Sequence, residues 1–129
     1  MSQIRVNDIR DSAGNNSSTP SQIYNGRAKI WVNFNGVGTV AIRDDYGVNS
    51  VSDNGGGDYT VNFSTAFSDN DYVILGCAGS TDSPTPSSGM TAVTIKQGVP
   101  LATGSARLST NYQNGGVHDQ DTTCVAAFR

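Results

Sequence analysis

The chain has 129 residues, which is enough for one domain with a modest core and too few for two. A net charge of -3 with eight scattered Lys and Arg residues argues against a nucleic-acid partner. No apolar run approaches the roughly 20 residues that a membrane-spanning helix needs. The N-terminal residues contain no apolar signal-peptide segment, which favours synthesis and folding in a cytoplasm. Much of the composition is Gly, Ser, Thr and Asn, which favour short strands and turns over helices.

Residues 1–26 are predicted to form an arm and linker outside the core. Ile4 to Ile9 alternates apolar and polar residues like one short strand, and the polar stretch Asp11 to Pro20 ends it. The strand either reaches a neighbouring subunit or pairs along the edge of its own domain, because both use the same backbone chemistry. The candidate contact residues of the arm are Ile4, Val6 and Ile9.

The segment from Ala28 to Tyr72 alternates apolar and polar residues in short runs separated by Gly, Asn and Asp, the pattern of antiparallel strands with one buried face. Its first run places Trp31 opposite the aliphatic side chains of the same strand. Either that second face is also covered, or Trp31 marks a subunit contact, where tryptophan is enriched. Trp31 is therefore a fourth candidate interface residue.

The rest of the chain continues this pattern. Asn35-Gly36 indicates a hairpin, Asp44 to Gly47 a turn, and the glycine-rich stretch Asp53 to Asp58 a second hairpin. The near-continuous apolar run Tyr72 to Ala78 predicts a central strand buried on both faces. Further strands are expected over 90–97, 105–112 and 123–129, so that about nine strands make an antiparallel β-sandwich of jelly-roll type over residues 27–129. No helix of three turns is expected.

No catalytic, cofactor-binding or metal-binding residue is predicted. The three glycines Gly55 to Gly57 lack the Lys-Ser or Lys-Thr of a phosphate loop, and every acidic residue is Asp, mostly in turns. A single His118 cannot complete a metal site within one subunit, although three copies on a threefold axis could, and any Ser-His-Asp chemistry would have to run through His118. Cys77 and Cys124 can form a disulfide only if their strands are neighbours, and a cytoplasmic origin favours free, buried thiols.

One long motif resembles a known module. The run WVNFNGVGTVAIRDDYGVNSVSDNGGGDYTVNF, from Trp31 to Phe63, and the apolar strand that begins near Tyr72, are similar to a β-rich module of bacteriophage tail fibres and other virion proteins. Upstream, IRVNDIRDSAG, from Ile4 to Gly14, resembles the strand and joint that precede this module. The resemblance covers about half of the chain, and residues after Gly79 are compatible with it but not specific.

The resemblance implies a virion structural protein, assembled in the host cytoplasm, that forms a homotrimer and contacts other virion proteins. Fibres carry this module on much longer chains, so two readings remain: a short fibre or fibre tip that binds a host surface glycan, or a capsid decoration (cement) protein that stabilises the phage head. A polysaccharide-cleaving enzyme is a third, less favoured reading. Residues in the two long polar loops and beside them are the candidate binding positions: Ser83, Thr85, Ser87, Tyr112 and His118.

Overall fold

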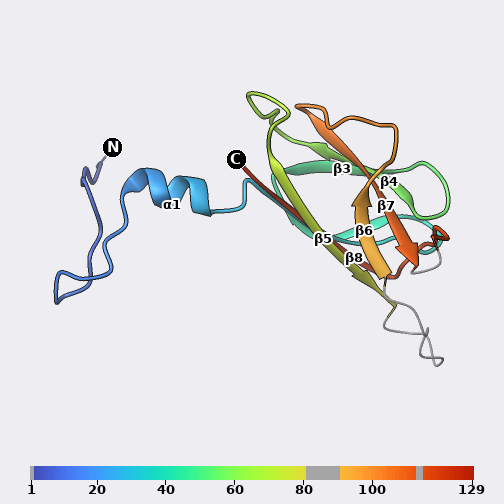
Figure 1. Cartoon of the computed structure of the whole chain (residues 1–129), viewed down its shortest axis with the longest axis horizontal. Coiled ribbons are helices and arrows are strands. Elements are labelled where there is room, and N and C mark those ends of the chain that lie inside the picture. Colours follow the sequence, from blue (N-terminus) through green and yellow to red (C-terminus); the bar gives the residue numbers. More distant parts are fainter. Residues whose placement is uncertain (1, 81–90, 113–114) are drawn as a thin grey trace.

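The computed structural model describes residues 2–80, 91–112 and 115–129. These residues form an antiparallel β-sandwich and a narrow N-terminal arm that projects from one end of it (Figure 1). The elements in chain order are α1 (Pro20–Gly26), β1 (Ile30–Asn35), β2 (Ala41–Tyr46), β3 (Val48–Asp53), β4 (Asp58–Phe63), β5 (Val73–Gly79), β6 (Thr91–Ile95), β7 (Ser105–Tyr112) and β8 (Thr122–Phe128).

The strands make two four-stranded sheets with the orders β2-β1-β8-β5 and β3-β4-β7-β6. Every pair is antiparallel, which confirms the all-β sandwich expected from the alternating sequence pattern. Consecutive strands pair in three hairpins, β1–β2, β3–β4 and β6–β7, whereas β1–β8, β4–β7 and β5–β8 join distant parts of the chain.

The core lies between the two sheets and is built from alternate residues of the central strands. It contains Ile30, Val32, Phe34, Val48, Tyr59, Val61, Phe63, Tyr72, Ala106, Leu108, Val125 and Ala127. Phe34 meets Tyr59 edge to face across the sandwich, with ring centroids 5.1 Å apart. Because side chains of a strand alternate between faces, the intervening residues of each strand lie on the two outer faces of the sandwich.

The prediction that the run from Tyr72 to Ala78 forms a central strand is wrong. Tyr72 is buried, but β5 is the edge strand of its sheet, and Val73 and Leu75 are exposed. Ile74 packs against the core, and Gly76 lies against Val93 of β6, where a Cβ atom would come within 2.7 Å of the Val93 Cγ1. The run is continuously apolar because one face of β5 packs against the core and the other face exposes apolar side chains. From the sequence alone, this arrangement looks the same as a strand that is buried on both faces.

The arm also differs from its prediction. Ile4 to Ile9 forms no strand, and Ile9 makes only an isolated bridge with Ser18. The arm instead contains the two-turn helix α1, which begins with a capping box in which Thr19 and Gln22 bond each other's backbone N–H groups. The sequence Thr-Pro-Ser-Gln, with a capping residue followed by proline, is the pattern from which this helix could have been predicted.

The turn expected at Asp44 to Gly47 is shorter than predicted. Asp44 and Tyr46 belong to β2, and the chain reverses at Gly47, whose φ is 70°. A Cβ atom at Gly47 would lie 2.8 Å from the Lys29 carbonyl oxygen, so both the backbone angle and the space at this position require glycine. The two aspartates extend the edge strand β2 and give it a charged edge.

Candidate functional site

One outer face of the sandwich is apolar and exposed. On the sheet β2-β1-β8-β5, Tyr46, Trp31, Ala126 and Leu75 are register partners in a single row across all four strands. Val73 and Phe128 form the adjacent row. We call these residues the outer apolar face: Trp31, Tyr46, Val73, Leu75, Ala126 and Phe128.

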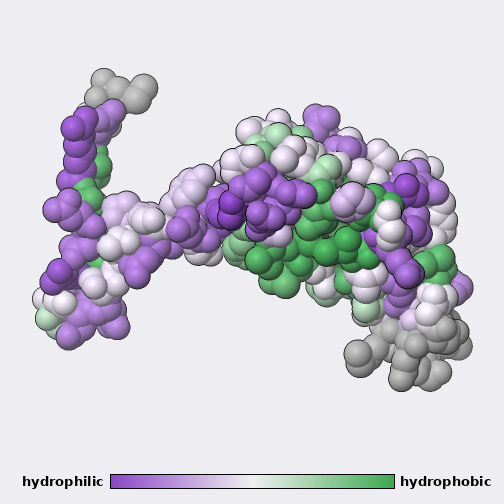
Figure 2. Space-filling model, turned by 45° about the horizontal axis from the view of Figure 1, so that its top comes forward, coloured by the Kyte–Doolittle hydropathy of each residue, from purple (hydrophilic) through white to green (hydrophobic). Residues whose placement is uncertain are grey.

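Four side chains of the outer apolar face retain large exposed fractions: 38% for Trp31, 52% for Tyr46, 58% for Val73 and 60% for Leu75. Figure 2 shows that hydrophobic residues gather into a continuous area on the side of the sandwich turned to the viewer, with hydrophilic residues around it. Scattered exposed apolar residues are normal, but a contiguous set is typical of an interaction surface. The placement of Trp31 opposite the core is as predicted.

The other outer face is polar. On the sheet β3-β4-β7-β6, Ser52, Thr60 and Arg107 form one row, and Ser50, Asn62 and Ser105 form the next. Asn62 donates hydrogen bonds to the hydroxyl groups of both Ser50 and Ser52, at 3.0 and 3.1 Å. The side chains on this face thus pair with one another, and the face resembles an ordinary solvated surface more than an apolar contact surface.

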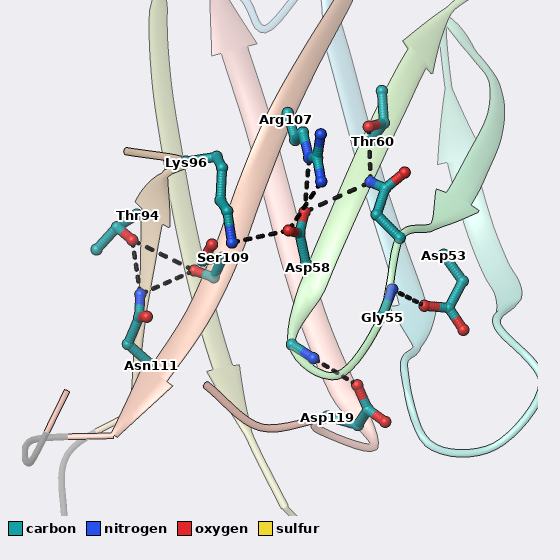
Figure 3. A network of polar contacts seen from close by, with 12 residues as sticks. Asp53, Gly55, Asp58, Thr60, Thr94, Lys96, Arg107, Ser109, Asn111 and Asp119 are labelled. Atoms are coloured by element: carbon teal, nitrogen blue, oxygen red, sulfur yellow. Dashed lines mark hydrogen bonds and ion pairs between the residues drawn. The ribbon is translucent and has the colours of Figure 1, made fainter. Parts of the chain in front are cut away.

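An ion-pair cluster lies at one end of the polar face (Figure 3). The buried carboxylate of Asp58 accepts two hydrogen bonds from Arg107, at 2.8 and 3.0 Å, and pairs with Lys96 at 2.8 Å. The Arg107 hydrogen bond and the two positive charges lower the pKa of Asp58 from 3.8 to about 2, although burial opposes the shift. The cluster joins β4 to β7 and to the end of β6, and it is structural in character because its charges are satisfied within the chain.

Asp58 predicts an acid-dependent loss of stability. Folding lowers the pKa of Asp58, so the ionised carboxylate adds about 2 kcal/mol to the free energy of unfolding. This contribution is complete above about pH 4 and is lost as the pH falls toward 2. We expect Asp58→Asn to be about 2 to 3 kcal/mol less stable than the wild type at pH 7, with a difference that shrinks between pH 4 and 2. Urea unfolding across this range measures both effects. Asp71→Asn, at an exposed position outside the cluster, is the matched control. A stability difference between Asp58→Asn and the wild type that stays constant at every pH would contradict the lowered pKa of Asp58.

The loops at the end of the sandwich far from the arm are held to one another. In Figure 1 the arm and the C-terminus lie at one end, and the loop from 115 to 121 lies at the other. Asp119 accepts hydrogen bonds from the Gly57 backbone N–H at 2.7 Å and from the Tyr59 hydroxyl at 2.6 Å. The Tyr112 ring packs on the His118 ring, with centroids 4.4 Å apart. This end therefore presents an exposed imidazole beside a half-buried phenol on a well-anchored loop.

The structure brings together some of the predicted site residues and separates others. Ile4, Val6 and Ile9 are exposed and line one concave surface of the arm, of about 630 Å³, together with Ile23 and Tyr24 of α1. Trp31 is not part of that surface, because it lies on the outer apolar face of the sandwich. Tyr112 and His118 are in contact at the far end. The predicted loop residues Ser83, Thr85 and Ser87 lie outside the described residues.

The two cysteines are neighbours, as a disulfide would require, but they are free. Cys77 of β5 lies directly opposite Cys124 of β8 in the register. The prediction of buried thiols is wrong, because Cys77 is exposed and Cys124 is half-buried. The reason is that both side chains point to the outer face of the sheet β2-β1-β8-β5, like Leu75 and Ala126, and not into the core between the sheets.

Within residues 2–80, 91–112 and 115–129, no group of three or more His, Cys, Asp or Glu side chains is placed to hold a metal ion. In the same part of the chain, no helix has the length and apolar character needed to cross a membrane. Comparison of the chain with protein-family models, curated proteins and solved structures finds no significant match. The fold defines the class of the protein as an antiparallel β-sandwich. Any assignment of function depends on its surfaces and its sequence.

Proposed function

We propose that the chain is a structural subunit of a bacteriophage virion, of the tail fibre or fibre-tip type, that assembles as a homotrimer. The observation that carries the proposal is the outer apolar face, where Tyr46, Trp31, Ala126 and Leu75 make an exposed row across a whole sheet. A second copy of the chain would remove this row from water. The phage assignment and the number of three subunits come from the resemblance of residues 31–63 to virion modules.

The accessible surface of the chain supports assembly. It amounts to 8171 Å², whereas a compact monomer of 13.5 kDa exposes about 6,500 Å². The difference is about twice the roughly 800 Å² that each partner contributes to a standard protein–protein interface. Part of it belongs to the arm, whose apolar residues Ile4, Val6 and Ile9 remain exposed beside α1. We infer that the arm contacts a neighbouring subunit or another virion protein.

The two ends of the sandwich suggest an orientation for the subunit. The arm projects from one end, and the loop that carries His118 lies at the other (Figure 1). An arm that anchors the subunit to the particle would leave Tyr112 and His118 facing away from it. Sugar rings stack on aromatic side chains that are held rigidly at an exposed position, because the apolar ring face and the polar hydroxyl groups are then both satisfied. We propose a host surface glycan as the ligand of this end.

Immunogold labelling of phage particles tests the proposal directly, with an antibody raised against the purified chain. We expect label on the tail or its fibres. Label on the head alone would replace the fibre assignment with capsid decoration, and unlabelled particles would remove the virion assignment altogether. Incubation of the protein with host polysaccharide, followed by measurement of new reducing ends, tests the enzyme alternative, for which we expect no release.

A further inference from the structure

The two thiols of the chain are placed as a disulfide requires. Cys77 and Cys124 are direct partners between the antiparallel strands β5 and β8, so their side chains lie on the same face of the sheet. Opposed residues of such strands have Cα atoms about 4.5 to 5.5 Å apart, which falls within the range of about 4.4 to 6.8 Å found across disulfides. Closure of the bond therefore needs rotation of side chains and little movement of the backbone.

The two thiols have different surroundings. Cys77 is exposed on an edge strand, where a small reagent can reach it. Cys124 is half-buried on the inner neighbouring strand, and burial, together with the adjacent Cys77, raises the pKa of its thiol, while the charge of Arg43 acts in the opposite direction. Because Cys77 is the more exposed of the two thiols, an external reagent reacts there first.

We propose that Cys77 and Cys124 form a redox pair that closes into an intramolecular disulfide by exchange with a low-molecular-weight disulfide such as glutathione disulfide. The Cys77 thiolate attacks one glutathione sulfur, breaks the glutathione S–S bond and releases one glutathione thiolate, which takes up the Cys77 proton. The Cys124 sulfur then attacks Cys77 Sγ, and the second glutathione leaves with the Cys124 proton. The protein loses two electrons and two protons, and one glutathione disulfide becomes two glutathione molecules.

The bond would join the ends of a long segment of the chain. The residues between Cys77 and Cys124 include β6 and β7, which belong to the opposite sheet, while β5 and β8 remain side by side in their own sheet. A disulfide that closes a loop of about 50 residues restricts the unfolded chain strongly. We expect the oxidised protein to melt about 5 to 15 °C higher than the reduced protein. This inference does not rest on the proposed function, because the strand register alone carries it.

The test is incubation of the purified full-length chain with glutathione disulfide, followed by acid quenching and mass spectrometry. We expect the wild type to lose two hydrogens, with Cys77 and Cys124 linked in one peptide, and dithiothreitol to reverse both this change and the rise in melting temperature. The Cys124→Ser variant should stop at a stable mixed disulfide on Cys77, and the Cys77→Ser variant should react at least 10-fold more slowly. A wild type that stops at the mixed disulfide, or that links two chains instead, would overturn the proposal, and this measurement requires no variant.

Discussion

Leu75→Asp is expected to convert the proposed homotrimer into monomers. Leu75 is 60% exposed on β5 and ends the row that runs through Ala126 and Trp31. If the outer apolar face is the subunit contact, the substitution places a carboxylate in that contact once per subunit. An unpaired charge there costs about 3 kcal/mol per subunit, which corresponds to a loss of affinity of more than 100-fold. Sedimentation velocity over a dilution series measures the change.

Thr94→Asp is the matched control for this experiment. Thr94 is also exposed on an edge strand, but it lies on β6 and faces outward on the polar sheet β3-β4-β7-β6. The same charge at this position should leave the assembly intact. Trp31→Ala should weaken assembly as well, by a smaller amount, since it removes contact area without adding a charge. If Leu75→Asp and Thr94→Asp sediment alike, the outer apolar face is not the contact.

Gly57→Ala is expected to destabilise the sandwich by about 3 to 5 kcal/mol. Gly57 has a φ of 63°, which alone costs an L-residue about 1 to 2 kcal/mol. A Cβ atom there would also lie 2.5 Å from the His118 backbone nitrogen and 2.9 Å from the Thr110 carbonyl oxygen. The loop that carries His118 would have to move and lose the hydrogen bond from Gly57 to Asp119. Thermal melting should show a decrease of about 10 °C or more.

Gly56→Ala provides the comparison within the same turn. A Cβ atom at Gly56 would meet nothing within 4 Å, so we expect a change of less than about 0.5 kcal/mol. The contrast would show that the glycine-rich turn requires glycine at position 57 because backbone segments approach closely there. Equal melting temperatures for the two variants would mean that the packing of Gly57 against His118 contributes little to stability.

The sequence by itself predicted the all-β class and the position of most strands. Ser105 to Tyr112 forms a strand with the predicted bounds, and Ile30, Val32 and Phe34 face the core as their alternation required. Strand positions and the faces of their side chains can be predicted from short stretches of sequence. Backbone geometry makes successive side chains of a strand alternate between its two faces, so neighbouring residues show the pattern. The outward direction of Trp31 followed from the same rule.

Only the tertiary structure decided which strands are neighbours and which faces are covered. It placed β5 at an edge, aligned Leu75 with the row of Trp31, and set Cys77 opposite Cys124. These pairings join β5 or β1 to β8 over long stretches of chain, and local sequence patterns do not specify them. The sequence does not show whether a second sheet, another subunit or water covers an apolar side chain. The exposed apolar face could therefore be identified only from the arrangement of the two sheets.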